Sequence, residues 1–415
     1  MSFDYIKIKE SRNIIPIELD GKQQYYLDLM NIENSWTGLI DVMFSNNFFR
    51  EAVQLVINAI TLFEKGYFDC AFYSLRQSLE LSTTVVYFVD DTEPNRKKKM
   101  KAWKNQDKFP MYGQMTTELQ NREKVFADIK KKMALYFREI EDAKQKLNKY
   151  VHKQGYDKFY VSRNNLLNPN SKMGHDKLVS DFNLFLVKCM GAIAVFRLAI
   201  DPLPLLLADE SIYNRTRQMI TEGYSEDFME KYIGLDHVEA YKQTDVYKSY
   251  YEELMKEEEM IPSVRDVVKN EYVDRTKVDE ILSQMHLLSI HDRVAVAFIS
   301  YSEKIARVYC IGGLKWYFTD TNSRRKKTGF SSTVFNVFKS GNRDYNVNYD
   351  EAFLSHMSVL EDDYYIEHNE EFSEKEIEGL KGIANAKFIG FDPNDLDSIL
   401  SQSNDNGEEL GASIE

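Results

Sequence analysis

The segment Gly66 to Leu81, GYFDCAFYSLRQSLEL, carries the pattern from which the fold of the first half of the chain follows. Gly66 ends one amphipathic segment, residues 46–65, and a second segment begins near Tyr67. In both, apolar residues recur at steps of three and four, which places them on one face of a helix. Because the connection is short, the two helices are predicted to form an antiparallel hairpin.

Further elements are expected on either side of this hairpin. A long, charged helix is predicted over about 116–153, and a more apolar, central helix over about 174–200. Near the N-terminus, residues 13–29 alternate around Asp20-Gly21, which predicts a β-hairpin. These elements together predict a first domain, residues 1–205, that is a helical bundle with an N-terminal hairpin.

The second region, residues 206–401, is predicted to be mixed α/β. Residues 209–290 have the pattern of several short helices, and residues 293–319 alternate as in a three-stranded antiparallel meander. The composition of residues 402–415 is typical of a disordered tail. The expected fold class is therefore mainly α, with a small antiparallel β-sheet in the second region.

Composition limits the classes of function. The net charge of −13 argues against general attraction to nucleic acids or anionic membranes, so such contacts need a local basic patch. The three cysteines are too far apart in sequence for a disulfide framework and fit a reducing compartment. The N-terminus lacks the apolar core of a signal peptide, and no apolar run reaches the roughly 20 residues of a membrane helix. We therefore expect a cytoplasmic protein that does not contact a membrane.

A candidate polar site lies in Asn148 to Tyr156, NKYVHKQGY, at the end of the long helix. Asn148 and His152 are four residues apart and face the same way. A histidine with a pKa near neutrality can act as the general base that RNA cleavage through the 2′-hydroxyl requires. Asn148, Lys149 and Lys153 can donate hydrogen bonds to a phosphate. The alternative is a histidine that only caps the end of the helix.

A second pair, Arg76 and Glu80, is four residues apart on the helix that follows Gly66. One interpretation is a surface ion pair of little energetic value. The other is a pair at the rim of a groove that orders a polar site.

A basic run lies between Pro94 and Pro110, where the helical pattern breaks. Lysine and arginine side chains of this run are candidates for phosphate contacts, and an indole can stack on an unpaired base. The alternative is a solvated loop that its tryptophan anchors to the core. The candidate RNA-binding residues here are Arg96, Lys97, Lys98 and Trp103.

The segment from Gly66 to Leu81 resembles the helix that follows the first turn of HEPN-type domains, which are helical bundles of prokaryotic toxins and anti-phage proteins and often ribonucleases. The segment from Leu147 to His152 resembles the last part of their catalytic motif, an arginine, a polar residue and then a histidine. Asn148 and His152 match this motif, whereas Leu147 occupies the position of the arginine. The resemblance covers about residues 40–200. It implies a homodimer whose cleft forms across the interface, or a partner protein. Because Leu147 occupies the position of the arginine, either Arg76 or a lysine substitutes for it, or the domain is a non-cleaving relative.

Two hypotheses about function follow. The first is an RNA-binding or RNA-cleaving effector of a bacterial defence or toxin system, a metal-independent ribonuclease with His152 as base and Asn148, Arg76 and Glu80 in support. The second is a non-catalytic interaction or scaffold protein that dimerises or docks a partner through its bundle, which Leu147 favours.

No cofactor or metal is expected. The sequence contains no GxxxxGK[ST], GxGxxG or GxSxG motif. His286 and His291 are five residues apart without further metal ligands nearby in sequence, and Glu361-Asp362-Asp363 is interpreted as a solvated acidic cluster.

Overall fold

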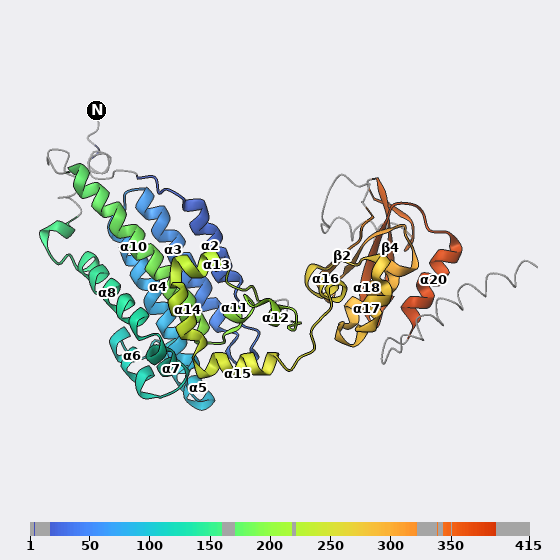
Figure 1. The fold of residues 1–415 in the computed structure, drawn as a ribbon. Helices are drawn as coiled ribbons and strands as arrows, with labels where there is room; N and C mark the ends of the chain where they lie inside the picture. The colour runs from blue at the N-terminus through green and yellow to red at the C-terminus, as the bar shows by residue number, and fades with distance from the viewer. Residues whose placement is uncertain are drawn as a thin grey trace, which may run out of the picture. The chain divides into compact units, whose positions relative to one another are not determined.

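The computed structural model describes residue 4 and residues 17–159, 171–217, 221–321, 338, 343–349 and 351–386. The chain divides into two compact units, Met1–Glu257 and Glu258–Glu415. The predicted fold class is confirmed, since the chain is mainly α with a small antiparallel sheet in the second unit (Figure 1). The predicted tail, residues 402–415, lies outside the described residues.

The boundary between the units follows residue 257, whereas the sequence analysis places it near residue 205. The difference arises because the helices after residue 205 belong to the core of the first unit. Tyr224, Tyr232 and Tyr241 are almost fully buried there, and they join one apolar cluster with the residues of the N-terminal helices.

The first unit consists of helices packed around a long central one. Their bounds are α2 (Lys22–Asn34), η1 (Ile40–Val42), α3 (Ser45–Glu64), α4 (Phe68–Val89), α5 (Glu93–Lys104), α6 (Tyr112–Asn121), α7 (Val125–Lys132), α8 (Ala134–Val151), η2 (Tyr156–Lys158), α10 (Ser171–Leu198), α11 (Leu203–Leu206), α12 (Glu210–Tyr213), α13 (Glu226–Phe228), η3 (Met229–Ile233), α14 (Leu235–Lys242) and α15 (Asp245–Leu254). The predicted hairpin of α3 and α4 is confirmed, and the left-handed Gly66 (φ 82°) connects its helices. The predicted central helix corresponds to α10, which packs against α3, α4 and α8 (Figure 1).

By length and composition, residues Asp176–Leu198 of α10 are apolar enough to cross a membrane, although the sequence analysis found no such run. Of the apolar window in this helix, 61% is buried inside the protein. A core helix has the same features, and the contacts of α10 with the surrounding helices account for its composition.

The predicted N-terminal β-hairpin is wrong. Within residues 17–29, Gly21 is left-handed (φ 70°) as expected, but it is the N-cap of α2 rather than the turn of a hairpin. Leu29 and Ile32 are buried on one face of this helix. A glycine with positive φ serves both structures, so the Asp-Gly signal alone does not distinguish them.

The predicted long helix over 116–153 is three helices, α6, α7 and α8. Glu123 is left-handed (φ 51°) in the connection between α6 and α7, and Met133 leaves the helical conformation (ψ 34°) between α7 and α8. Leu119, Ile129 and Met133 are nevertheless all buried in the core of the first unit.

The second unit combines helices with a five-stranded antiparallel sheet of order β2-β1-β5-β4-β3. Its elements are α16 (Pro262–Asn270), η4 (Arg275–Lys277), α17 (Val278–Ser283), η5 (Met285–Leu287), α18 (Ile290–Tyr301), β1 (Ile305–Cys310), β2 (Lys315–Phe318), β3 (Val347–Tyr349), β4 (Ala352–Val359), β5 (Asp362–His368) and α20 (Glu374–Asn385). Helix α18 packs on β1, and α20 packs on both α18 and β4 (Figure 1).

The predicted meander is correct for two of its three strands. β1 and β2 pair around Gly312-Gly313 as expected, but the segment assigned to the first strand is the helix α18. Ser289 and Asp292 form a capping box that begins this helix, and Val294 to Ile299 are all buried. A short segment that is apolar on every side has no periodicity to separate a buried helix from a buried strand.

Candidate functional site

The candidate site of the first unit lies where α4 packs against α8. The rings of Phe72 and Tyr150 stack between the two helices, with centroids 4.4 Å apart. Leu147 and Tyr150 are buried, so α8 turns this face to the core. Asn148 lies next to that face and is half-buried, at the rim of the contact between the helices.

Arg76 joins the two predicted groups of residues. Its Nε donates a hydrogen bond to Oδ1 of Asn148 at 2.8 Å, and its second guanidinium nitrogen donates to Oε1 of Glu80 at 2.6 Å. The Arg76 and Glu80 side chains are 21% and 24% exposed. The pair is therefore at the rim of a helix contact and orients Asn148, rather than being an isolated surface ion pair.

Lys144 lies one helical turn before Asn148 on α8 and extends the same polar strip. Its ammonium lies 3.4 Å from a carboxylate oxygen of Glu141 and 3.5 Å from the ring centroid of Tyr112. Burial lowers the pKa of Lys144 below its ordinary value, against the opposing charges of Glu141 and Glu80. A partly desolvated cation here adds positive potential beside Arg76.

His152 is exposed at the C-terminal end of α8. Its backbone N–H closes the last turn on the carbonyl of Asn148 at 2.8 Å, and Lys153 is left-handed (φ 54°) immediately after it. Within the described part of the chain, the imidazole makes no hydrogen bond or ion pair. The structure brings together Arg76, Glu80 and Asn148 without His152.

Leu147 occupies the position where the resemblance to HEPN-type domains implies an arginine. Its side chain is 1% exposed and packs with Leu79, Phe185 and Cys189 around a small internal space. The residue at position 147 therefore points into the core, and the arginine beside Asn148 comes from α4 instead.

The other two lysines near His152 have different environments. Lys149 is exposed, whereas Lys153 forms an ion pair with Asp69 of α4. Tyr73 lies one turn after Asp69 and three residues before Arg76, so helical spacing puts its side chain on the same strip. It is 53% exposed, and the sequence analysis missed it although the i, i+4 spacing from Asp69 would have identified it.

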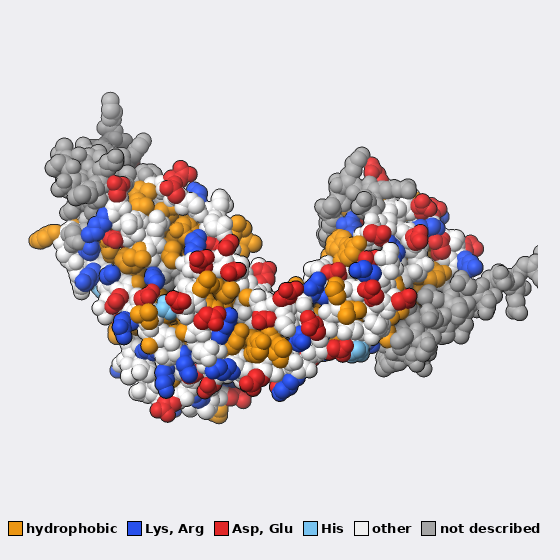
Figure 2. Space-filling model, in the orientation of Figure 1, with side chains coloured by type: hydrophobic (Ala, Val, Ile, Leu, Met, Phe, Trp, Pro, Cys, Tyr) orange, Lys and Arg blue, Asp and Glu red, His pale blue; other side chains and the backbone are white. Residues whose placement is uncertain are grey.

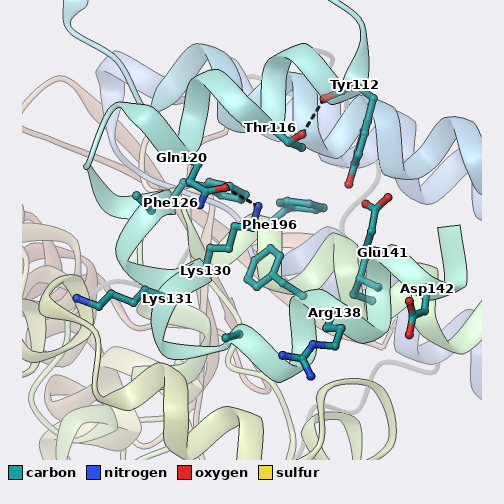
Figure 3. Close-up of a pocket in the computed structure, with 14 residues that line it drawn as sticks. Tyr112, Thr116, Gln120, Phe126, Lys130, Lys131, Arg138, Glu141, Asp142 and Phe196 are labelled. Atoms are coloured by element: carbon teal, nitrogen blue, oxygen red, sulfur yellow. Dashed lines mark hydrogen bonds between the residues drawn. The ribbon is translucent and has the colours of Figure 1, made fainter. Parts of the chain in front are cut away.

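A cavity of about 750 Å³ opens beyond Glu141, between α6, α7 and α8 (Figure 3). In this view the Tyr112 hydroxyl and the Glu141 carboxylate point toward one another at one end, and Lys130 donates to Gln120 at the other. Phe126 and Phe196 stack nearly parallel at 12° in its wall. The cavity thus combines aromatic walls with charged groups of both signs at its rim.

The predicted basic loop, residues 96–104, is part of the helix α5, with Pro94 in its first turn. Trp103 is 40% exposed, and its ring contacts Phe48 and Phe88 at centroid distances of 5.3 and 6.0 Å, which anchors α5 to the core.

Lys97 pairs with Glu93, while Lys98 is exposed and Arg96 is half-buried. Figure 2 shows basic and acidic side chains interspersed on the visible face of the first unit. This helix is therefore a weaker candidate for RNA contact than the strip on α4 and α8.

The expectation that no metal ligands converge near His291 is wrong. In the second unit, His291, Cys310 and Asp362 place one ligand atom each within 4.8 Å of one another. Asp362, interpreted as part of a solvated acidic cluster, is only 17% exposed. These residues come from three separate elements, so their spacing in the sequence gave no indication of the cluster.

Comparisons of the chain with protein-family models, with curated proteins and with solved structures find no match. The function is therefore argued from the geometry of the two units.

Proposed function

We propose that the first unit is a HEPN-like RNA-binding and RNA-cleaving effector, of the kind that acts in bacterial defence or toxin systems. The observation that carries this proposal is the hydrogen bond between Arg76 and Asn148. This hydrogen bond places the guanidinium of Arg76 beside Asn148, the first residue of the Asn-x3-His pattern, although residue 147 is leucine. Lys144 adds a second cation on the same strip.

In the proposed reaction, His152 takes the proton of a ribose 2′-hydroxyl as general base. The 2′ oxygen attacks the adjacent phosphorus, the bond to the 5′ oxygen breaks, and that oxygen is protonated from solvent. The products are a 2′,3′-cyclic phosphate and a 5′-hydroxyl. Arg76 and Lys149 stabilise the charge that develops on the phosphate oxygens, and the Asn148 amide nitrogen donates to them. This route needs no metal ion.

Tyr73 gives the strip a site for a base. Its half-exposed ring lies between the pair formed by Lys153 and Asp69 and the pair formed by Arg76 and Glu80. An aromatic ring beside cations is the combination that binds single-stranded nucleic acid, because the ring stacks on a base while the cations contact phosphates. Single-stranded RNA is therefore the proposed substrate.

A homodimer is part of the proposal. The HEPN resemblance implies that the cleft forms across an interface between two copies. The exposed position of His152 at the end of α8 is compatible with such an arrangement, since a second copy can approach it.

The test is cleavage of a mixed RNA pool by the purified full chain without added metal. We expect His152→Ala to lower the cleavage rate at least about 100-fold, the usual contribution of a general base. His286→Ala is the matched control, since His286 is an exposed histidine of the second unit that contacts Glu258. Equal cleavage by wild type and His152→Ala would refute the assignment of the base.

Two observations favour the second hypothesis, a non-catalytic interaction protein. Leu147 is buried, and Glu80 already neutralises part of the Arg76 charge. If folded wild-type protein neither cleaves nor binds RNA, this hypothesis replaces the first, whereas a homodimer is expected under both.

A further inference from the structure

Three ligand-type side chains converge in the second unit from separate elements. His291 lies in the first turn of α18, Cys310 ends β1, and Asp362 begins β5. Nδ1 of His291 lies 3.2 Å from Sγ of Cys310 and 3.4 Å from Oδ2 of Asp362. The sulfur lies 3.1 Å from the same carboxylate oxygen. The three atoms thus form a nearly equilateral triangle.

The size of this triangle matches one face of a zinc coordination tetrahedron. Zinc binds sulfur at about 2.3 Å and nitrogen or oxygen at about 2.0–2.1 Å, so tetrahedral ligand atoms lie roughly 3.3–3.6 Å apart. Two of the observed separations, 3.1 and 3.2 Å, are slightly below that range, and the third, 3.4 Å, lies within it. An ion would need only a small outward movement of the three side chains.

The same three residue types also occur in cysteine-nucleophile triads, but the geometry here excludes one. In a triad the imidazole uses one nitrogen for the nucleophile and the other for the carboxylate. Here a single nitrogen, Nδ1 of His291, faces both Cys310 and Asp362.

The surrounding backbone holds the carboxylate in one orientation. Oδ1 of Asp362 accepts hydrogen bonds from the backbone N–H of Gly312 at 2.7 Å and of Asp363 at 2.8 Å. Oδ2 is thereby directed toward Cys310 and His291. A Cβ atom at Gly312 would collide with the Asp362 carboxylate, and one at Gly313 would lie 3.0 Å from Cδ2 of His291. The Gly-Gly turn between β1 and β2 thus lets the backbone close around the cluster.

We propose that the second unit binds a Zn²⁺ ion through Nδ1 of His291, Sγ of Cys310 and Oδ2 of Asp362. The deprotonated thiol and the carboxylate together supply two negative charges, which balance the divalent ion. A sulfur and an imidazole ligand select zinc over magnesium and calcium, which prefer oxygen. Metal binding displaces the thiol proton to solvent.

The ligand set leaves a fourth coordination position. Three protein ligands plus a water molecule is the composition of catalytic zinc sites, whereas structural sites are closed by four protein ligands. His291 is 28% exposed, so solvent reaches this side of the cluster. The Tyr364 hydroxyl lies 3.0 Å from Nδ1 of His291 and is placed to contact a ligand in the fourth position.

The first experiment is zinc binding by the purified full chain, measured by elemental analysis and by competition with a chromogenic chelator. We expect one zinc ion per chain. Cys310→Ser and Asp362→Asn should each lower the affinity at least about 100-fold, since even the loss of an outer partner of a ligand costs about 10- to 100-fold. Cys70→Ser and His286→Gln are the matched controls and should bind zinc as the wild type does, because both positions are exposed and outside the cluster.

A second measurement separates coordination from an effect on folding. Cobalt(II) in place of zinc should give the near-ultraviolet charge-transfer absorption of a thiolate ligand in the wild type and in Cys70→Ser, and not in Cys310→Ser. This signature requires a cobalt–sulfur bond, which a merely structural role of Cys310 would not produce. Absence of stoichiometric zinc from the wild type, or unchanged affinity in both ligand variants, would overturn the proposal.

Discussion

The guanidinium of Arg76 on α4 donates a hydrogen bond to the amide oxygen of Asn148 on α8 at 2.8 Å, across 72 residues of sequence. The same guanidinium donates to Glu80 at 2.6 Å. Two partners fix its plane, so its orientation is set before any ligand arrives. This arrangement makes Arg76 the residue on which the proposed RNA site depends most directly.

Arg76→Lys should therefore weaken RNA binding although it keeps the positive charge. An ammonium lacks the planar set of donors that contacts Asn148 and Glu80 at the same time. We expect at least a tenfold loss of affinity (about 1.4 kcal/mol) for a single-stranded RNA, measured by fluorescence anisotropy at fixed salt. Arg50→Lys is the control, because Arg50 pairs with Glu33 and lies over Trp36 away from the site. No loss in Arg76→Lys would indicate that only the positive charge matters, and equal losses in both variants would show that the effect is not specific to position 76.

Tyr73→Ala should lower the affinity for single-stranded RNA by about 1–3 kcal/mol, the usual contribution of a stacked aromatic ring. Tyr73→Phe keeps the ring and should bind within about twofold of the wild type. The same anisotropy titration checks both variants. If Phe and Ala at position 73 weaken binding equally, the hydroxyl rather than the ring makes the contact, and stacking is refuted.

The helices of the first unit could be predicted where their apolar periodicity was long and regular. The α3–α4 hairpin is the example, since many buried residues at steps of three and four define a face of each helix. Helix α10 was predicted from its apolar composition instead. The breaks at Glu123 and Met133 could not be predicted, because neither residue is a glycine or a proline. The contact between Arg76 and Asn148 also needed the packing of α4 on α8, although the sequence placed each residue on the correct helix.

The second unit contains features that could not be predicted from the sequence. The hairpin of β4 and β5 turns through Leu360 and Glu361, which are both left-handed (φ 51° and 67°). This two-residue turn normally contains asparagine or glycine, so the sequence carried no signal for it. Without the turn, Asp362 could not be assigned to a strand beside β1. The zinc ligands therefore became visible only through the tertiary structure.

Leu147→Arg should destabilise the first unit, although it would introduce the arginine that the resemblance to HEPN-type domains implies at this position. The side chain at position 147 is 1% exposed among Leu79, Phe185 and Cys189, where a guanidinium would have no acidic partner among the residues that line this space. We expect a loss of at least about 3 kcal/mol of unfolding free energy, the usual scale for an uncompensated buried charge. Leu147→Ala should cost about 2–5 kcal/mol through the cavity it creates. Urea unfolding measures both, and a stable Leu147→Arg variant with higher RNase activity would contradict the assignment of position 147 to the core.

Gly191→Ala should destabilise the packing of α10 against η3. A Cβ atom at residue 191 would collide with the backbone carbonyl of Tyr232, and a backbone group cannot rotate away as a side chain can. We expect a loss of about 1–3 kcal/mol, the usual cost of overpacking. Gly113→Ala in α6 is the control, since its Cβ meets nothing within 4 Å and should be neutral or stabilising by up to about 1 kcal/mol. The midpoint of thermal unfolding should therefore fall in Gly191→Ala and stay unchanged or rise in Gly113→Ala.

His368 should make the second unit less stable in mild acid. Its ring is fully buried against Phe372, with Nε2 2.9 Å from Oγ of Ser355 and Nδ1 2.7 Å from the backbone carbonyl oxygen of Glu370. Because Nδ1–H donates to that carbonyl, neutral Nε2 accepts from the Ser355 hydroxyl, and protonation of Nε2 would require this hydroxyl to turn and accept instead. Burial is the main cause that lowers the pKa of His368 to about 4.

The direction of the pH effect follows from proton binding. In the unfolded chain, His368 binds a proton near its ordinary pKa of about 6.5, whereas in the folded chain it does so only near pH 4. The contribution of His368 to stability is therefore complete above about pH 6.5 and decreases as the pH falls toward 4. Between pH 7 and 5 the loss should be about 2 kcal/mol. Hydrogen exchange of the β4 and β5 amides, corrected for intrinsic rates, measures this loss within the second unit. His368→Gln should weaken the pH dependence of stability, and His286→Gln, a change at an exposed histidine, should leave it unchanged. An equal pH dependence in the wild type and in His368→Gln would assign the effect to other groups.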